Sequence, residues 1–266
     1  MAKRVVQRDP ELLAHQQWLG YLQPVGLVVA PAAMQDAGWV VARSGSELIE
    51  RQQRYRDCLE PLGGDDDDAD ERELGFTGIE TLLVEQLGWG TDQVQSDQKL
   101  IEDYTRELPE LGETLQPTAV VPVASGEGAQ LLVQELPLLT PLDQKLTAGE
   151  HLWRASPQER FERLLRETGV EAGLLFNGAQ LRLVVAPKGE SSGYLTFPLA
   201  DLAEVSGRLM FSGLDLLLGQ SHVFLDPDGY RLSDVLKKSR SFQAVVSNAL
   251  ADQVLAALWD LLRGFQ

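Results

Sequence analysis

The sequence predicts a mixed α/β (α+β) fold with helical segments at both ends. Residues 117–137, PTAVVPVASGEGAQLLVQELP, have the pattern of a strand, a glycine-bearing turn and a second strand. Residues 172–189 repeat this pattern around Asn177-Gly178, a pair whose positive φ angles match the twist of a two-residue hairpin. Residues 156–169, which lie between the two hairpins, are expected to form a helix. Because hairpins alternate with helices, we expect a sheet layered with helices.

The first expected segment, residues 1–62, is helical. An apolar stripe runs through residues 10–34, where Pro24 and Pro31 interrupt it. A second helix is expected to begin after the N-cap Ser46.

The second expected segment, residues 63–73, is an acidic loop with the sequence GGDDDDADERE. It carries seven carboxylates and almost no apolar side chain, which is typical of a solvated loop. A calcium-binding loop would need alternating acids, a turn glycine and a closing glutamate, and this spacing is absent. An acidic tongue that mimics DNA or binds a basic partner stays open as an alternative.

The third expected segment, residues 74–200, is the α/β core. It begins with an amphipathic helix at residues 78–89, whose apolar face holds four side chains: Ile79, Leu82, Leu83 and Leu87. Residues 95–110 are polar and show no clear pattern. A third strand is expected at residues 194–199, beside the second hairpin.

The helix at residues 156–169 has the strongest end signals in the chain. Ser156 is a suitable N-cap, and Glu159 completes a capping box with it. Gly169 stands where a helix commonly ends in a left-handed residue. The last expected segment, residues 201–266, is helical.

Length and composition limit the class of protein. The chain has 266 residues, of which 44% are hydrophobic, so it can form one large domain or two small ones. Charges or prolines interrupt each apolar run before it reaches membrane-spanning length, and no apolar signal core follows the basic start. The single cysteine, Cys58, excludes an internal disulfide. We therefore expect a cytoplasmic protein with no membrane partner.

The net charge of −17 is unevenly distributed. Residues 1–150 hold 11 Lys or Arg against 27 Asp or Glu, whereas residues 151–266 hold 12 against 13. Protein–DNA affinity depends strongly on Lys and Arg that neutralise phosphates. The first half is therefore a poor DNA-binding surface, while the second half can present a local basic face.

The common catalytic patterns are absent from the sequence. It contains no G-x-S-x-G elbow, no phosphate-binding loop that ends in GK[ST] and no HExxH motif. The histidines, His15, His151 and His222, are far apart, and Cys58 has no histidine near it in the sequence. An enzyme whose catalytic groups converge from distant positions stays open as an alternative.

The first hairpin has the shape on which many nucleases build a metal site. Such a site needs carboxylates that hold Mg²⁺ and a lysine that stabilises charge at the phosphate. Here the corresponding positions hold Thr118, Gln134 and Leu136, and Glu135 faces the opposite side of its strand. We therefore expect no catalytic residue at this hairpin, and no metal or cofactor in this chain.

Nearly the whole chain resembles the N-terminal region of large type IIG-like restriction–modification DNA adenine methylases, such as the methylase of the DISARM phage-defence system. The resemblance is carried by residues 78–136 and by the run SPQERFERLLRETGVEAGLLFNGAQLRLVVAPKGESSGYLTFPLADL. Residues 15–34 near the start and residues 236–266 at the end look like the same group. It implies a degenerate PD-(D/E)XK nuclease-like core within residues 74–200. Pro117-Thr118 would stand at Pro-Asp, residues 134–136 at Glu-x-Lys, and Glu80 or Glu85 at the acid of the first helix.

The methyltransferase part of that family is missing from this chain. The (N/D/S)PP(Y/F/W) motif that would hold the amino group of a flipped base does not occur, nor does the glycine-containing turn for S-adenosylmethionine. The chain is therefore expected to be an N-terminal piece or a separate, non-catalytic subunit. Its expected partners are a methyltransferase domain or other subunits of the defence system.

The sequence supports two main hypotheses about contacts. In the first, an accessory module touches DNA through five basic side chains: Arg182, Lys188, Lys237, Lys238 and Arg240. In the second, a protein-interaction subunit binds a partner, without DNA, through the apolar face of a C-terminal helix: Phe242, Val246, Leu250, Val254, Leu258 and Leu262. An acidic DNA mimic that blocks restriction enzymes is a further alternative.

Overall fold

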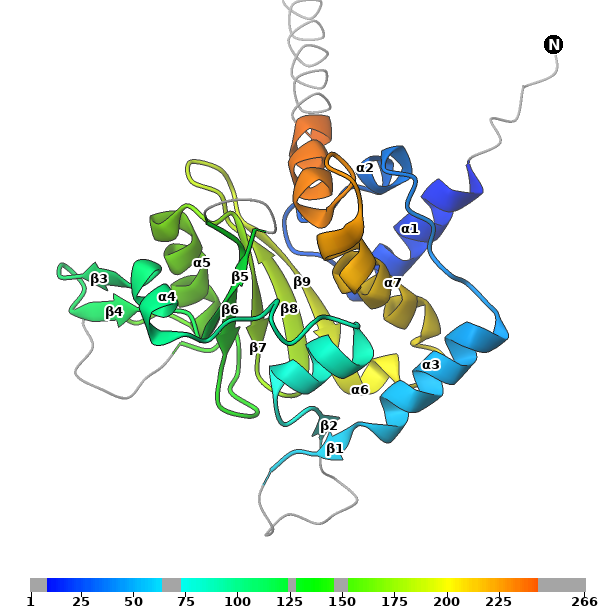
Figure 1. Ribbon diagram of the computed structural model, residues 1–266, viewed down its shortest axis with the longest axis horizontal. Coiled ribbons are helices and arrows are strands. Elements are labelled where there is room, and N and C mark those ends of the chain that lie inside the picture. The colour runs from blue at the N-terminus through cyan, green and yellow to red at the C-terminus, as the bar shows by residue number, and fades with distance from the viewer. Residues whose placement is uncertain (1–8, 64–72, 124–127, 146–152, 244–266) are drawn as a thin grey trace, which may run out of the picture.

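The computed structural model describes residues 9–63, 73–123, 128–145 and 153–243. Its centre is a mixed five-stranded sheet with the strand order β5-β6-β7-β8-β9 (Figure 1). Strands β6 and β7 are parallel, and all other neighbours are antiparallel. The predicted mixed α/β fold is confirmed. The bounds of the five strands are β5 (Ala119–Pro122), β6 (Ala129–Glu135), β7 (Ala172–Phe176), β8 (Gln180–Val185) and β9 (Gly193–Pro198).

Both predicted hairpins are present. Strands β5 and β6 pair with Ala119 opposite Val133, and the register shifts at Val121/Pro122. The turn between β7 and β8 is held by the Asn177 side chain, whose Oδ1 accepts hydrogen bonds from the Ala179 and Gln180 amides. The third strand, β9, pairs with β8 as expected.

Helix α5 (Pro157–Thr168) makes the parallel connection between β6 and β7. Its ends follow the sequence signals. The Glu159 amide donates to Ser156 Oγ, the Ser156 amide donates to Glu159 Oε2, and Gly169 is left-handed with φ 79°. The capping box fixes where the helix begins, and hence where Arg160 and Phe161 lie over the sheet.

We expect Ser156→Ala to lower the free energy of unfolding by about 1 kcal/mol, because it leaves the Glu159 amide without its cap. Chemical denaturation followed by circular dichroism would measure the change. The exposed Ser206→Ala is the matched control and should change stability by less than about 0.5 kcal/mol. Equal effects of the two substitutions would contradict a capping role for Ser156.

The sheet is covered on both faces, which gives three layers. On one face lie α5, the helix α4 (Gln98–Asp103) and a small sheet of β3 (Arg106–Leu108) and β4 (Glu113–Leu115). On the other face lie the N-terminal and C-terminal helices (Figure 1). These are α1 (Pro10–Leu22), α2 (Pro31–Asp36), α3 (Ser46–Asp57), α6 (Leu199–Leu202), α7 (Arg208–Leu218) and the helical residues 232–243.

Two segments on this second face are π-helices, η2 (Thr81–Gln86) and η3 (Ser221–Leu225). Residues 78–89 were predicted to form an ordinary amphipathic helix. The predicted apolar face is buried, but the hydrogen bonding is of the wider π type across Thr81–Gln86. π-Helices are rare and occur frequently at functional sites.

Other local predictions are corrected or lie outside the described residues. Helix α3 begins at Ser46 itself, with Gly45 as the N-cap and no side-chain cap hydrogen bond. The ambiguous residues 95–110 hold α4 and β3. A short ladder joins β1 (Glu60–Pro61) to β2 (Leu74–Gly75), on either side of the acidic loop. Of that loop, the structure describes only Gly63 and Glu73.

Helices α1 and α7 pack against each other. Trp18 of α1 is fully buried, and its indole lies over Gly213 of α7, where a Cβ would be 2.6 Å from the ring. Within the described ranges, no helix combines the length and the apolar character needed to cross a membrane.

His15 is buried inside this helical layer. Its Nε2 is 2.9 Å from the Trp39 carbonyl oxygen, and Trp18 Nε1–H donates to its Nδ1 at 3.3 Å. This arrangement requires a neutral ring that carries its proton on Nε2. Burial lowers the pKa of His15 below its ordinary value of 6.5, although the Trp39 hydrogen bond acts in the opposite direction.

This lowered pKa predicts a loss of stability in mild acid. As the pH falls below about 6.5, the unfolded chain takes up a proton at residue 15 that the folded chain resists, so the free energy of unfolding decreases. Denaturation at about pH 7.5 and about pH 5.5 would measure this in the wild type and in His15→Gln. The variant should be less stable at the higher pH but should lose less on acidification. An equally steep loss in the variant would contradict the assignment.

Each edge of the sheet is closed by one isolated β-bridge to a residue outside the five strands. At the β5 edge, Gln95 and Val120 exchange two main-chain hydrogen bonds of 2.9 and 2.8 Å. At the β9 edge, Val25 and Tyr194 do the same at 3.0 and 2.8 Å. Unpaired edge strands are templates for further pairing, so these bridges limit the length of open edge.

Candidate functional site

Thr118, the first of the three positions compared with a nuclease site, has a structural role. Thr118 immediately precedes β5, and its hydroxyl donates to the Val133 carbonyl at 3.1 Å and accepts from the Glu135 amide at 2.9 Å. Both hydrogen bonds join the start of β5 to β6. The hydroxyl is therefore committed to holding the hairpin together.

The two other positions compared with a nuclease site, Gln134 and Leu136, line a cavity of 420 Å³ between β6, β4 and α5. Leu136 and the Gln134 side chain face this cavity, together with Phe161 and Leu164 of α5. Glu135 lies on the opposite face, as expected, and its Oε1 accepts from the Ile79 amide at 3.2 Å. The cavity walls are mainly apolar, which suits an apolar group and not a hydrated Mg²⁺ ion.

Arg182 is a correction to the predicted DNA contacts, because it is only 4% exposed. Its guanidinium makes two hydrogen bonds to Asp143, at 2.8 and 2.9 Å, and others to Gln158 Oε1 and Thr196 Oγ1. The group also stacks 4.0 Å from the Tyr194 ring centroid. The hydrogen bond from Arg182 lowers the pKa of Asp143 below its ordinary value of 3.8. Arg182 therefore fastens β8 to β9, α5 and the loop before α5.

The other four predicted DNA contacts differ in how far they are engaged within the chain. Lys238 Nζ donates to the Gly229 carbonyl at 2.9 Å, and Arg240 forms a 2.7 Å ion pair with Glu190. Lys188 and Lys237 are exposed. Two of the five predicted cations are thus on the surface, and their side chains have no hydrogen bond or ion pair to the described residues.

The predicted C-terminal apolar face lies mostly outside the described residues. Phe242 is within the described helix 232–243 and is 36% exposed. Val246, Leu250, Val254, Leu258 and Leu262 lie beyond residue 243, where the structure gives no description.

A polar cleft that the sequence did not indicate lies between α3, η2, α7 and η3. Its volume is 680 Å³, and both π-helices contribute to its walls, η2 through Glu85 and Gln86 and η3 through Ser221 and His222. A hydrogen bond from the Gln220 amide to the Leu87 carbonyl, 3.0 Å long, joins the two π-helical regions. No sequence motif connects these residues, because they come from three separate parts of the chain, within residues 51–58, 85–88 and 211–222.

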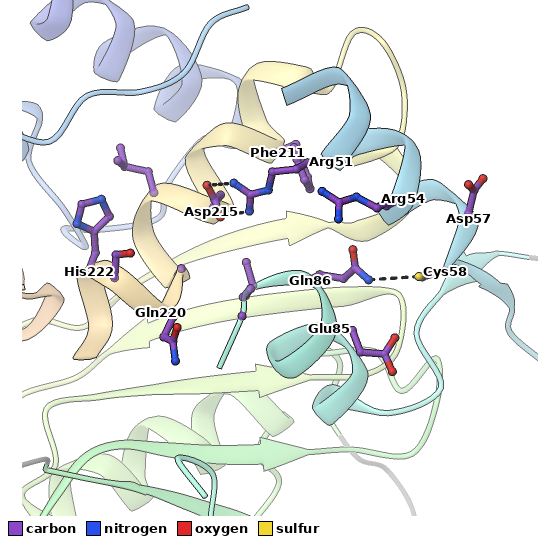
Figure 2. A pocket seen from close by; sticks show the side chains of 15 residues that line it. Arg51, Arg54, Asp57, Cys58, Glu85, Gln86, Phe211, Asp215, Gln220 and His222 are labelled. Atoms are coloured by element: carbon purple, nitrogen blue, oxygen red, sulfur yellow. Dashed lines mark hydrogen bonds and ion pairs between the residues drawn. The ribbon is translucent and has the colours of Figure 1, made fainter. Parts of the chain in front are cut away.

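The side chains of this cleft are held in defined positions (Figure 2). Arg51 and Asp215 face each other in a bidentate ion pair, whose Nη1–Oδ2 distance is 2.8 Å. This hydrogen bond raises the pKa of Arg51 above its already high value. Arg54 lies beside the pair and is exposed.

The cleft does not assemble a nucleophile and a base. Cys58 Sγ accepts from Gln86 Nε2 at 3.2 Å, whereas His222 lies at the opposite end of the cleft (Figure 2). His222 Nδ1 is 2.6 Å from Asp226 Oδ2, and the centroid of its ring is 4.4 Å from that of Trp39, with the two planes tilted by 36°. A nucleophilic cysteine needs its base within hydrogen-bond reach, so this geometry suits polar binding better than covalent catalysis.

The described residues contain no group of three or more His, Cys, Asp or Glu side chains that could hold a metal ion. Comparison of the chain with protein-family models found no match, and comparisons with curated proteins and with solved structures found none either.

Proposed function

We propose that this chain is a non-catalytic accessory module of a bacterial DNA restriction–modification or phage-defence system, with a role like that of the N-terminal region of an adenine-specific DNA methyltransferase. The observation that carries this proposal is the β5–β6 hairpin. Its nuclease-like positions hold a threonine that joins two strands and two side chains that line a mainly apolar cavity. A nuclease would hold carboxylates and a lysine at these positions. Their replacement by structural residues is what we expect of a degenerate PD-(D/E)XK core that serves as a scaffold.

We favour binding to a partner protein over binding to DNA as the role of this scaffold. Of the five basic side chains first considered for DNA, Arg182 is buried, and Lys238 and Arg240 bind groups within the chain. The net charge of −17 opposes an approach to phosphates. The module therefore acts through protein surfaces, and its partner is a methyltransferase polypeptide or another subunit of the same system.

Assembly with a methyltransferase tests the proposal directly. The reading frames beside the gene should include an adenine methyltransferase that carries the (N/D/S)PP(Y/F/W) motif. When the two are co-expressed, the tagged chain should retain that methyltransferase in stoichiometric yield on gel filtration. A neighbourhood without a DNA-modification gene, or a methyltransferase that elutes separately, would overturn the proposal.

Nuclease and DNA-binding assays test the non-catalytic part of the proposal. The chain should leave duplex DNA intact with Mg²⁺ or Mn²⁺, and gel-shift assays should show no binding across a salt series. Cleavage that disappears in Glu80→Gln or Glu135→Gln would show that the hairpin is an active site after all. If the chain binds DNA at low salt and the double variant Lys188→Gln/Lys237→Gln binds more weakly, the DNA-contact hypothesis would be supported instead.

A further inference from the structure

Strand β9 is the last strand of the sheet (Figure 1). A groove of 710 Å³ lies at its outer edge. Its walls come from the C-terminal end of α1, from the strand itself and from the α6–α7 region. Its lining residues include Tyr21, Thr196, Asp201, Glu204 and Met210.

The strand edge inside this groove has main-chain groups free to pair. Tyr194 directs both its N–H and its C=O outward to Val25. Main-chain groups of a strand alternate in direction, so those of Thr196, two residues later, also point outward. Within the described part of the chain, the Thr196 N–H and C=O have no hydrogen-bond partner, and the residue is only half-buried.

The chain's own bridging segment cannot fill this position. An antiparallel continuation from Val25 would place Gln23 opposite Thr196. Gln23 instead adopts a left-handed conformation with φ 49° as the C-cap of α1, and its N–H donates a hydrogen bond to the Leu19 carbonyl. The edge is therefore closed at Tyr194 and open at Thr196.

The walls of the groove define the chemistry of an occupant. Asp201 and Glu204 are its only charged lining residues within the described structure, and both are exposed acids. Tyr21, which is 56% exposed, and Met210 add apolar surface on the side of the helices. Alternating side chains of a bound strand would meet these walls while its main chain meets Thr196.

We propose that this groove binds an extended segment of a partner protein that carries lysine or arginine, by adding one antiparallel or parallel bridge to the β9 edge at Thr196. Complementary charge favours a basic segment, and the free N–H and C=O favour a strand over a helix. The inference names the chemistry of the partner contact and rests on the proposed function for its biological setting.

A labelled peptide, acetyl-Lys-Thr-Lys-Val-Lys-Thr-Lys-amide, is the probe for fluorescence anisotropy with the full chain. We expect saturable binding that is at least about tenfold tighter than that of the peptide with Glu at each Lys position, and that weakens as salt is raised. Absence of saturable binding up to about 1 mM peptide would overturn the inference.

N-Methylation of the peptide tests main-chain pairing. Only alternate residues of a strand point their N–H groups to the same edge, so two peptides methylated at odd or at even positions should behave differently. One should lose at least about tenfold in affinity and the other should change little. Equal losses, or no loss in either peptide, would contradict pairing at Thr196.

The acidic wall is tested with Asp201→Asn/Glu204→Gln, which should weaken binding by roughly five- to tenfold. Glu47→Gln/Glu50→Gln on α3 removes the same charge from exposed positions outside the groove and is the matched control. Equal effects of the two double variants would show that only net charge matters, which overturns the groove as the site.

The peptide assay and the methyltransferase assay can fail separately. Peptide binding without methyltransferase assembly would leave the groove assigned and remove the proposed function. Assembly with a methyltransferase that neither competes with the peptide nor depends on Asp201 and Glu204 would keep the proposed function and remove this inference.

Discussion

Arg182→Met should lower the free energy of unfolding by about 2 to 4 kcal/mol, the largest effect expected from a single charged residue in this protein. Methionine matches the length and apolar character of the arginine stem. It leaves the buried Gln158 Oε1 without its guanidinium donor, in a place where water has little access, and it removes the donor to the half-buried Thr196 Oγ1. Chemical denaturation, followed by intrinsic fluorescence, measures the loss.

Arg182→Lys separates the effect of the positive charge from that of the hydrogen bonds. Lysine retains the charge but lacks the planar group that reaches Asp143, Gln158 and Thr196 together. Its stability should therefore lie between those of the wild type and Arg182→Met. A lysine variant as stable as the wild type would show that the positive charge alone is needed. The hydrogen bonds from the guanidinium group would then contribute nothing to stability.

Acid denaturation is a second test of the contact between Arg182 and Asp143. The hydrogen bond from Arg182 lowers the pKa of Asp143 below 3.8, so its contribution is present above that value and is lost as the pH falls through the lower, folded-state pKa. In Arg182→Met this part of the acid dependence should disappear. Parallel acid profiles for the variant and the wild type would contradict the pairing.

Gly173→Val should destabilise the fold by about 3 kcal/mol or more, and Gly173→Ala by about 1 to 3 kcal/mol. Gly173 lies in β7, directly under α5. A Cβ there would be 2.5 Å from Phe161 Cζ and 2.6 Å from the Leu132 carbonyl oxygen. The ring can shift, but the carbonyl belongs to the neighbouring strand β6 and cannot move without disturbing the sheet.

Gly20→Ala is the matched control for this prediction. Gly20 is an exposed position in α1 where an added Cβ would meet nothing within 4 Å. Alanine should stabilise a helix there by up to about 1 kcal/mol. The double variant Gly173→Ala/Phe161→Leu should remain less stable than the wild type, because it relieves only the contact with the ring. Full recovery of stability in the double variant would show that the strand carbonyl imposes no limit.

The sequence predicts those parts of the fold whose signals are local. The hairpin at Asn177-Gly178 and the helix that begins at Ser156 are each specified within a few residues, and both are confirmed. The π-helical turn at Thr81–Gln86 was not predicted, because the same apolar face suits an ordinary helix. Residues distant in the sequence contact both of its ends: the Ile79 amide donates to Glu135 Oε1, and the Leu87 carbonyl accepts from the Gln220 amide.

Arg182 shows why the surface was harder to predict than the sheet. It is the one charged residue in the run LRLVV, on a strand with neighbours on both sides, and that context indicates burial. A buried arginine requires a partner, yet Asp143 is 39 residues away in a stretch without a pattern. The cleft between η2 and η3 was unpredictable for the same reason, since its side chains come from residues 51 to 222.

The single bridges at the two sheet edges bear on how this protein can be divided. Val25 closes one edge and Gln95 the other, and neither belongs to the span from Ala119 to Pro198 that supplies the five strands. The apolar core on one face likewise continues from Ala14 to Leu236. A fragment cut to the sheet and α5 would present two bare strand edges and an uncovered face, and we expect it to aggregate. Interaction mapping with this protein therefore calls for point substitutions in the intact chain in place of deletion fragments.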